Sequence, residues 1–273
     1  MQTIVQESQA LAYYVYGVVL GQNIAAPAVP AIEPDAPVLC VGEGELTALV
    51  TPLPLDRFDP DLLEERLSDL EWLEPRARAH QAVLASVAAP VAPLRFGTIF
   101  RDEEGVRSML RTNRALFRTA LDRLVGRREW GLKIYADPKR VADYVCGASE
   151  HVRSMIIQRS RMSSGAAYLI QKKLDMRILD ESRKLTERSL CEIQTRLSTS
   201  IVASAGGAVS RRSEEGPELI FSVAYLIDEV RFTKFAAELD VIVERYPWLG
   251  FELSGPWPAY SFATTPAQES GDV

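Results

Sequence analysis

The sequence predicts an α+β protein of two domains. Apolar runs rich in aromatic and β-branched residues, which are typical of strands, recur along the chain. Longer stretches with helical periodicity lie between them. A third feature, the sequence Gly-Arg-Arg at residues 126–128, has the character of a hinge. We therefore predict an N-terminal α+β domain over residues 1–127, a second domain over residues 128–262, and a flexible tail over residues 263–273.

Bulk composition places the protein among soluble globular proteins. Its 273 residues can bury a sizeable core, and a hydrophobic content of 47% with 25% charged residues is ordinary for that class. A net charge of −6 argues against a general nucleic-acid binder. No apolar run reaches the roughly 18 residues of a membrane span, and the first residues do not resemble a signal peptide. We expect a cytoplasmic protein that binds neither membrane nor nucleic acid.

The three cysteines, Cys40, Cys146 and Cys191, are odd in number and far apart. This pattern favours reduced thiols packed as small apolar residues over a disulfide framework.

The first half opens with a strand predicted over residues 11–20, followed by a loop rich in Ala and Pro over residues 21–36. Short apolar runs at residues 38–41 and 46–50 flank Gly42-Glu43-Gly44-Glu45, which predicts a β-hairpin. A dinucleotide-binding loop is disfavoured there, because a third glycine and a following helix are both missing.

Three helices follow in the first half. Asp59 and Pro60 predict the start of a helix over residues 60–73, and a second one is predicted over residues 76–88. Helical periodicity returns over residues 102–125, where arginines fill the face opposite the apolar positions. Those arginines either meet solvent or face an acidic partner.

The second half reads strand, helices, strand, strand, helix, strand. The strands are predicted at residues 129–135, 201–209, 219–227 and 248–253, and the main helices at 138–146, 166–197 and 230–246. This is the βαββαβ plan of a ferredoxin-like domain, here with an extended helical insertion in the first crossover. The apolar stripe of the helix over residues 166–197, which includes Leu169 and Leu174, is predicted to be a seam inside that domain.

The chain closes on Ser254–Phe262, in which Gly255 and Pro256 are expected to end the last strand. Trp257, Tyr260 and Phe262 are large rings that need a surface to cover them. We predict that the stretch folds back as a clasp and locks the last strand onto the second domain. A partner-binding anchor is the alternative for Trp257 and Tyr260.

Three short segments carry a resemblance to a known family. They are Pro93-Leu-Arg-Phe-Gly-Thr98, Glu129-Trp-Gly-Leu-Lys133 and Ser254-Gly-Pro-Trp-Pro-Ala-Tyr-Ser-Phe262. Their order and separation resemble the gas vesicle protein family GvpL/GvpF. The likeness extends from Tyr14-Val-Tyr-Gly17 to Phe262, and His80 falls where that family carries a histidine. Ala259 is a departure, because the family usually has a second internal proline there.

The resemblance implies a non-enzymatic accessory or minor structural protein of gas vesicle assembly, located in the cytoplasm and at the gas vesicle. The implied partner is the small hydrophobic shell protein, with other gas vesicle accessory proteins as further candidates, and no cofactor is expected. The motif residues are then structural or partner-binding. They are Arg95, Phe96, Gly97, Thr98, Trp130, Gly255, Trp257, Pro258 and Tyr260.

Two motif residues have specific structural interpretations. Arg95 either ties its turn to nearby carbonyls or a carboxylate, or it faces a partner together with Phe96. Gly97 is expected to allow a positive φ angle or a close backbone approach.

No catalytic pattern is visible in the sequence. His80 and His151 have no neighbours at metal-ligand spacing, and both the Gly-x-Ser-x-Gly and the phosphate-loop motifs are missing. We therefore predict no catalytic, cofactor-binding or metal-binding residues. The alternative function is a small-molecule-binding enzyme or sensor built on the ferredoxin-like domain. RNA binding on its sheet is disfavoured by the acidic composition.

Overall fold

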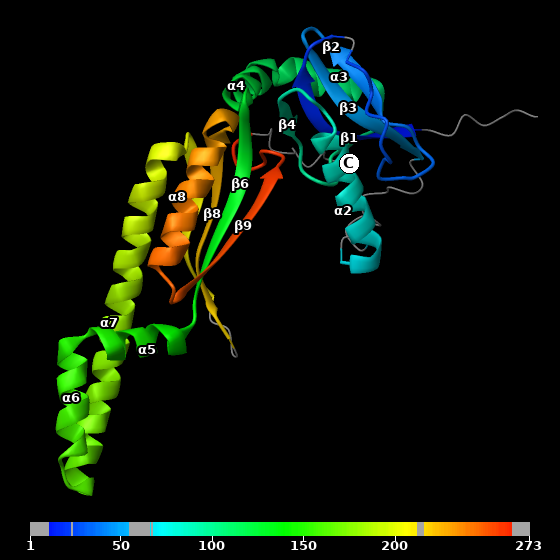
Figure 1. Cartoon of the computed structure of the whole chain (residues 1–273). Coiled ribbons are helices and arrows are strands. Elements are labelled where there is room, and N and C mark those ends of the chain that lie inside the picture. The colour runs from blue at the N-terminus through cyan, green and yellow to red at the C-terminus, as the bar shows by residue number, and fades with distance from the viewer. Residues whose placement is uncertain (1–10, 23, 55–65, 67, 212–215, 264–273) are drawn as a thin grey trace, which may run out of the picture. The chain divides into compact units, whose positions relative to one another are not determined.

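The computed structural model describes residues 11–22, 24–54, 66, 68–211 and 216–263 and divides the chain into two compact units (Figure 1). Unit 1 comprises Met1–Glu129 and Pro256–Val273, and unit 2 comprises Trp130–Gly255. Each unit combines helices with its own sheet, so the predicted α+β class is confirmed. The predicted second domain also included residues 256–262, which here belong to unit 1 because they pack against it. Of the predicted tail, Ala263 is buried, and the remainder lies outside the described residues.

Unit 1 is built on a sheet with β1 (Leu11–Leu20) near its middle. The strand order is β2-β3-β1-β4, and β5 (Ile99–Phe100) also pairs with β1. The predicted hairpin is confirmed, since β2 (Leu39–Glu43) and β3 (Leu46–Pro54) pair antiparallel up to Glu43 and Leu46. Strands β1 and β3 are buried along almost their whole length, so both faces of the sheet are covered.

Helix α2 (Leu70–Ala85) contributes Val83 and Leu84 to the core that contains Tyr14, Tyr16 and Leu49. Asp69 caps it, because the carboxylate accepts from the amides of Glu71 and Trp72. The predicted break between residues 73 and 76 is wrong, since Pro75 lies inside this helix. Half of the helix predicted over residues 60–73, namely residues 60–65 and 67, lies outside the described residues.

The helix predicted over residues 102–125 is two helices, α3 (Glu103–Thr112) and α4 (Arg114–Leu124). They separate at Asn113, whose side-chain amide donates to the Met109 carbonyl at 3.0 Å. A short polar side chain competes for backbone groups in this way and ends the first helix.

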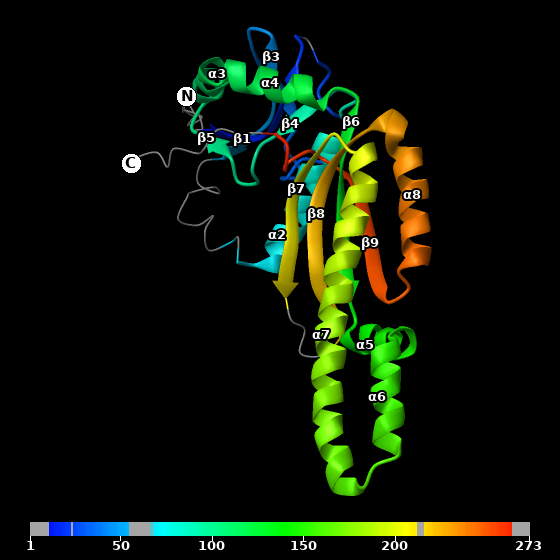
Figure 2. The ribbon, with the colours of Figure 1, turned by 90° about the vertical axis from the view of Figure 1, so that its left-hand side faces the viewer.

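Unit 2 holds a second sheet of order β7-β8-β6-β9. Its strands are β6 (Arg127–Ala136), β7 (Ala203–Arg211), β8 (Glu218–Asp228) and β9 (Leu249–Trp257). Its main helices are α5 (Pro138–Ala148), α6 (Glu150–Ser160), α7 (Ser164–Leu197) and α8 (Phe232–Arg245). Figure 2 shows α7 and α8 lying along one face of this sheet.

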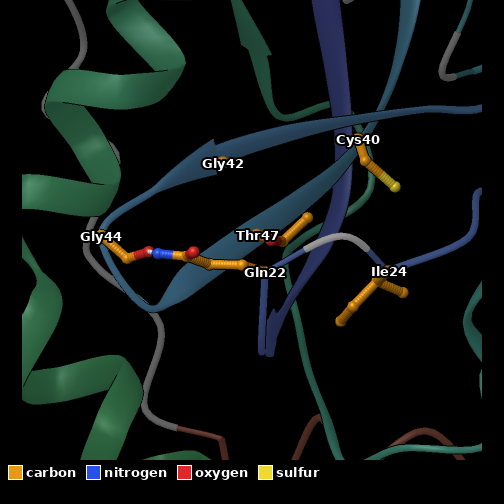
Figure 3. A pocket seen from close by; sticks show the side chains of 6 residues that line it. All are labelled: Gln22, Ile24, Cys40, Gly42, Gly44 and Thr47. Atoms are coloured by element: carbon orange, nitrogen blue, oxygen red, sulfur yellow. Dashed lines mark hydrogen bonds between the residues drawn. The ribbon is translucent and has the colours of Figure 1, made fainter.

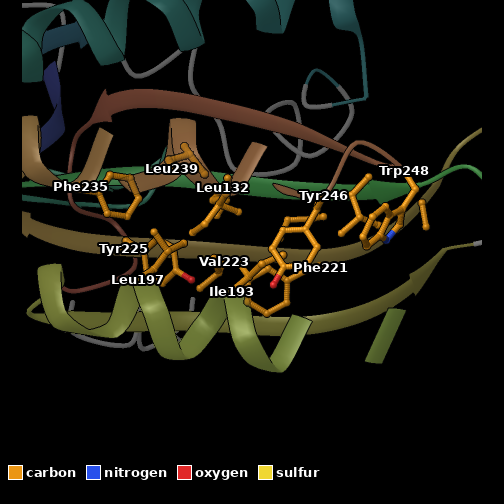
Figure 4. Close-up of a cluster of buried hydrophobic side chains, with 14 of the residues drawn as sticks. Leu132, Ile193, Leu197, Phe221, Val223, Tyr225, Phe235, Leu239, Tyr246 and Trp248 are labelled. Carbon is orange, nitrogen blue, oxygen red and sulfur yellow. The ribbon is translucent and has the colours of Figure 1, made fainter. Parts of the chain in front are cut away.

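The core of unit 2 is formed by alternate residues of its strands, which point toward the helices. Leu132, Ile134 and Ala136 on β6 are all buried on the helix side. Ile193 and Leu197 of α7 meet them there, with aromatic residues of β8 and α8 between (Figure 4). This continuous apolar layer fixes the register of each strand, because a shift by one residue would reverse the buried face.

Strand β9 does not end at Gly255 and Pro256 as predicted, but continues to Trp257. It is an edge strand, and a proline is tolerated at an edge because its missing N–H costs no interior ladder bond. Gly255 has a φ of 126°, which residues with a side chain rarely adopt.

Helices α6 and α7 form an antiparallel hairpin that reaches beyond the sheet of unit 2 (Figure 2). Helix α6 was not predicted as a separate element, although Ser149 caps it by accepting from the Val152 amide. A small cluster of Val145, Val152 and Leu174 packs inside the hairpin. The predicted seam of α7 is confirmed at Leu174, Ile193 and Leu197, which are buried.

Candidate functional site

In the part of the chain that the structure describes, no three His, Cys, Asp or Glu side chains gather as a metal site would require. No helix among those residues is long and apolar enough to cross a bilayer. The two histidines lie in different settings, since His80 is buried in α2 whereas His151 is exposed on α6.

The closing segment, defined here as Pro256–Ala263, folds onto unit 1 as a tight turn. The amide of Tyr260 donates to the Pro258 carbonyl at 2.8 Å, and the amide of Ala263 donates to the Ala259 carbonyl at 2.9 Å. Ala259, Phe262 and Ala263 are buried. The expected fold-back is therefore present, and it brings Tyr260 and Ser261 onto His80 and Glu129 of unit 1.

Glu129 anchors the closing segment within unit 1. Its carboxylate accepts hydrogen bonds from the Ser261 amide at 2.9 Å and from the Ser261 hydroxyl at 2.8 Å. Burial raises the pKa of this carboxyl, and the two bonds from Ser261 partly offset that effect. Nearby, the Arg123 guanidinium lies 5.7 Å from the ring centroid of Phe262.

His80 is the centre of an aromatic cluster in unit 1. Its Nδ1 is 2.6 Å from the Tyr14 hydroxyl, and its ring centroid is 5.8 Å from that of Phe96. The Tyr260 ring stacks over the imidazole with a centroid distance of 6.2 Å. His80, predicted only as a family likeness, thus packs with residues of two of the three motif segments, Phe96 and Tyr260, and with Tyr14 of β1.

The charge states of the cluster suit packing better than acid–base chemistry. Burial lowers the pKa of His80 to about 4, so the imidazole is neutral at neutral pH. Burial likewise raises the pKa of Tyr14 well above its usual value, and burial followed by the nearby Glu129 charge raises the pKa of Tyr260. A general acid or base works best with a pKa near the operating pH, and none of these groups has one.

The Leu94–Thr98 turn lies beside a bulge in β1 at Tyr16. Leu94 donates its amide to the Tyr16 carbonyl and the Thr98 carbonyl accepts from the Val15 amide, each at 2.9 Å. Within the turn, the Thr98 hydroxyl donates to the Arg95 carbonyl at 2.7 Å, and Gly97 has the expected positive φ, 87°. The motif therefore closes a gap in the sheet between β4 (Val91–Pro93) and β5.

Of the two interpretations of Arg95, the tie to its own turn is not made. Among the described residues its exposed guanidinium has no hydrogen bond or ion pair, and the Thr98 side chain makes the tie instead. Phe96, the neighbouring residue, is half-buried against Tyr14 and His80.

Trp130 and Gly255 belong to unit 2, unlike the other predicted site residues. The Trp130 ring stacks on Phe232 with a centroid distance of 3.9 Å and an interplanar angle of 16°. Each of these residues lies next to a point where the chain passes between the units, at Glu129–Trp130 and at Gly255–Pro256. The predicted residues are thus divided between the two units.

The arginine face of α3 and α4 meets the β2–β3 turn of its own unit. Arg111 pairs with Glu43, and Arg118 pairs with Glu45 at 2.9 Å. Arg107 donates to the Gly42 carbonyl. The sequence left open whether these arginines meet only solvent or face an acidic partner. In the structure, the acidic β2–β3 turn of the same unit pairs with them.

A shallow polar hollow of about 440 Å³ lies beside the same hairpin (Figure 3). Gln22 reaches across it and donates to the Gly44 carbonyl at 2.6 Å, and the Thr47 hydroxyl donates to the Gly21 carbonyl. Burial raises the pKa of the Cys40 thiol, which disfavours the nucleophilic thiolate. These hydrogen bonds hold the loop that follows β1.

The outer face of α7, defined here by Tyr168, Leu169, Lys172, Met176 and Leu179, exposes several large apolar side chains. Leu169, Met176 and Leu179 are 63%, 64% and 73% exposed. Residues at such positions fall within one side of a helix about 100° wide. The prediction that Leu169 lies in the buried seam is wrong, because the seam runs through Leu174 on another side of the helix. The sequence signal for this face is a set of apolar residues whose helical positions lie on a different side from those of the buried seam.

Comparison with known proteins supports a single family. Residues 12–264 match the family described as gas vesicle synthesis protein GvpL/GvpF. Gas vesicle protein L of Streptomyces sp. (strain CB03234) is 35% identical over 229 residues, which cover 81% of this chain and 80% of that protein. Gas vesicle protein F of the same strain is 26% identical over 261 residues, covering 91% and 98% of the two chains.

The fold is shared as well. The crystal structure of the gas vesicle protein GvpF from Anabaena sp. PCC7120 matches with a TM-score of 0.67 at 16% identity, over 94% of this chain and 98% of that one. The closing segment, the Leu94–Thr98 turn and buried His80 thus lie inside a match that spans nearly the whole sequence. The chain belongs to the GvpL/GvpF family of gas vesicle proteins.

Proposed function

We propose that this protein is a non-enzymatic accessory or minor structural protein of gas vesicle assembly, and that it binds the small hydrophobic shell protein through the outer face of α7. Membership of the GvpL/GvpF family supports a role in gas vesicle assembly. The observation that carries the contact is the exposure of Leu169, Met176 and Leu179 on one side of a helix.

The physical argument concerns apolar surface on both partners. A subunit that will line a gas-filled wall must carry apolar surface before it is incorporated, and such surface in water drives misassembly. A helix face with exposed Leu and Met side chains can cover a matching helix, and methionine adapts its shape to the partner. Lys172, which lies 5.2 Å from the Tyr168 ring, adds a positive charge at the edge of this face.

Two further assignments belong to the proposal. We class unit 2 as ferredoxin-like, because a β-α-β-β-α-β succession is threaded through a sheet of order β7-β8-β6-β9, with the α5–α7 segment as the extended insertion. We place the protein in the cytoplasm and at the gas vesicle, where the shell protein would be met. Other gas vesicle accessory proteins are further candidate partners.

The alternative, a small-molecule enzyme or sensor on unit 2, is not favoured. Such a function needs an open pocket with convergent polar groups. The layer between sheet and helices in unit 2 is instead filled by buried side chains such as Phe221, Val223 and Phe235 (Figure 4).

The test is co-purification of the full chain with a co-expressed shell protein. The variant Leu169→Glu/Met176→Glu/Leu179→Glu should lose the shell protein while keeping the wild-type unfolding midpoint, because exposed side chains contribute little to stability. The matched control is Leu70→Glu/Val230→Glu, which alters exposed apolar residues elsewhere and should retain binding. Undiminished binding by the α7 variant would overturn the proposed contact.

A second measurement separates a transient role from a retained one. Purified vesicles are washed with denaturant and probed for this chain. Retention identifies a structural subunit, whereas release together with impaired assembly after gene deletion identifies an assembly factor. Normal vesicles after deletion, combined with no shell-protein binding, would overturn the proposed function as a whole.

A further inference from the structure

We propose that the outer face of α6, defined here by Arg153, Ile156, Ile157, Ser160 and Arg161, binds an acidic amphipathic helix of a partner protein. Helix α6 lies in the part of the hairpin that reaches beyond the sheet of unit 2, and its principal neighbours are α5 and α7 (Figure 2). The outer face of α6 shares no residue with the outer face of α7. The inference therefore does not depend on the proposed shell-protein contact.

The members of the outer face of α6 lie on one side of the helix. Their positions follow the spacing i, i+3, i+4, i+7 and i+8, which places side chains on a single helical face. The buried side of α6 is a different one, where Val152 and half-buried Met155 pack in the cluster that contains Leu174 of α7. Ile156 and Ile157 lie outside that cluster and are 38% and 52% exposed.

Positive charge surrounds this pair of isoleucines. Between Glu150 and Asp175 the sequence has five Arg or Lys residues and no Asp or Glu, although the whole chain carries a net charge of −6. Arg153 stands three positions before the isoleucine pair and Arg161 four positions after it, which is about one helical turn in each direction. Both arginines are exposed, and among the described residues neither guanidinium has a hydrogen bond or an ion pair. The face is thus an apolar centre with a free cation toward each end.

Other basic helix faces of this chain are matched by its own carboxylates. The arginines of α3 and α4 pair with Glu43 and Glu45 of the β2–β3 turn. Farther along α7, Arg177 pairs with Glu181 at 2.7 Å. The outer face of α6 has no such partner within the described part of the chain. Carboxylates that match it are therefore expected from another protein, since arginine pairs well with them.

The pattern of the face specifies the shape of the partner segment. Helices pack side by side through apolar residues that recur every three or four positions. A helix that lies along α6 can place an apolar pair against Ile156 and Ile157. An Asp or Glu one turn before that pair and another one turn after it then meet Arg153 and Arg161. This arrangement is the charge complement of the face, and it is the helix-on-helix form of recognition.

A lipid surface and a nucleic acid are weaker candidates. Membrane binding by an amphipathic helix increases with the apolar area that it buries, and aromatic residues commonly contribute to it. The outer face of α6 offers two partly exposed isoleucines and no aromatic residue. Single-stranded nucleic acids also need aromatic side chains for stacking, and the net charge of −6 opposes binding of a polyanion.

The experiment selects a displayed library of helical peptides, randomised at their surface positions, on the immobilised full chain. Peptides that also bind the fourfold variant Arg153→Gln/Ile156→Ser/Ile157→Ser/Arg161→Gln are removed. The remaining peptides are expected to carry Asp or Glu one turn before and one turn after an apolar pair. Their binding should weaken at least about tenfold in Arg153→Gln/Arg161→Gln and in Ile156→Ser/Ile157→Ser. It should also weaken as NaCl rises from about 0.05 M to about 0.5 M.

Matched variants separate this face from other surfaces and from loss of folding. Lys234→Gln/Val241→Ser removes an exposed cation and an exposed apolar side chain from α8, and it should leave peptide binding unchanged. Leu179→Ala, on the outer face of α7, should also leave it unchanged. Arg153→Lys/Arg161→Lys keeps both charges and should retain most of the binding. The unfolding midpoint of each variant shows whether it folds.

Four outcomes would overturn the proposal. The first is that no peptide distinguishes the wild type from the fourfold variant. The second is that the selected peptides are basic or carry no acidic residue. The third is that vesicles of phosphatidylcholine and phosphatidylserine bind the wild type but not the fourfold variant. The fourth is dimerisation in sedimentation that the fourfold variant abolishes, because it would assign the face to a second copy of this chain.

Discussion

Glu129 and Ser261 are 132 positions apart in the sequence, yet they form a two-point contact within unit 1. One carboxylate oxygen accepts from the backbone amide of Ser261 and the other from its hydroxyl. The side chain of Glu129 is almost fully covered, with 7% of the residue exposed. This contact, together with the stacking of Tyr260 on His80, is what holds the closing segment in place.

The first prediction concerns this contact. Ser261→Ala removes one hydrogen bond and should lower the free energy of unfolding by about 1 kcal/mol. Glu129→Ala should cost more, about 1–3 kcal/mol, because it also leaves the Ser261 amide unpaired. Glu129→Gln keeps an acceptor and should fall between wild type and Glu129→Ala. Urea unfolding measures all three, with exposed Glu187→Ala as the control. Equal stability of the two alanine variants would contradict the two-point contact.

The second prediction is a pH dependence that originates at His80, which is 1% exposed. Burial lowers the pKa of His80 to about 4 from 6.5. Between these values the unfolded chain takes up a proton that the folded chain does not. Stability should therefore fall as the pH drops from about 6.5 to about 4, by roughly 3 kcal/mol in total from this group.

The measurement is the free energy of unfolding at a series of pH values for wild type and His80→Phe. At pH 7 the variant should be less stable by about 1–3 kcal/mol, because the Tyr14 hydroxyl loses its partner. The gap should narrow as the pH falls, since the variant has no group to protonate there. His151→Gln, at an exposed position of α6, is the control for replacing a histidine outside the core. A constant gap across the series would refute the assignment to His80.

The third prediction concerns the ion pairs between Glu45 and the arginines of α4. Arg114 and Arg118 both hydrogen-bond to this carboxylate and lower its pKa. All three side chains are partly exposed, so the contribution to stability should be small and sensitive to salt. Glu45→Gln should lower the melting temperature slightly at low ionic strength, and the difference should vanish in about 1 M NaCl. A difference that survives high salt would point to packing of the turn and not to charge.

Local sequence patterns predicted most of the elements but not their partners. The aromatic and β-branched residues at 11–20 were sufficient to place one strand, and the Gly42–Glu45 turn with its flanking apolar runs was sufficient to place a hairpin, because both signals depend on neighbouring residues. Pro75 led to a wrongly predicted helix boundary. A proline early in a helix removes one hydrogen bond but does not necessarily end the helix. Helix α6 was missed because its hydrophobic periodicity is weak and its cap, Ser149, is the main signal.

Long-range contacts explain the larger errors. The closing segment is adjacent in sequence to β9, which made the second domain the expected surface, but Ser261 finds its acceptor at Glu129. A buried carboxylate with no partner among its sequence neighbours is not visible in a single sequence. The outer face of α7 was not predicted for a related reason. The sequence alone does not distinguish an exposed leucine such as Leu179 from a buried one such as Leu174, because burial depends on which elements pack against the helix.

The last prediction tests the backbone of edge strand β7, where two adjacent glycines differ in their surroundings. Gly206 has a φ of 99°, and a Cβ there would lie 2.6 Å from the Ser222 carbonyl oxygen on β8. Gly206→Ala should therefore destabilise the protein by about 1–3 kcal/mol, because both the backbone angle and the close approach resist a side chain. At Gly207 a Cβ would meet nothing within 4 Å, so Gly207→Ala should be neutral or slightly stabilising through the unfolded state. Thermal unfolding of the two variants provides the comparison, and equal midpoints would show that β7 relaxes away from β8 at Gly206.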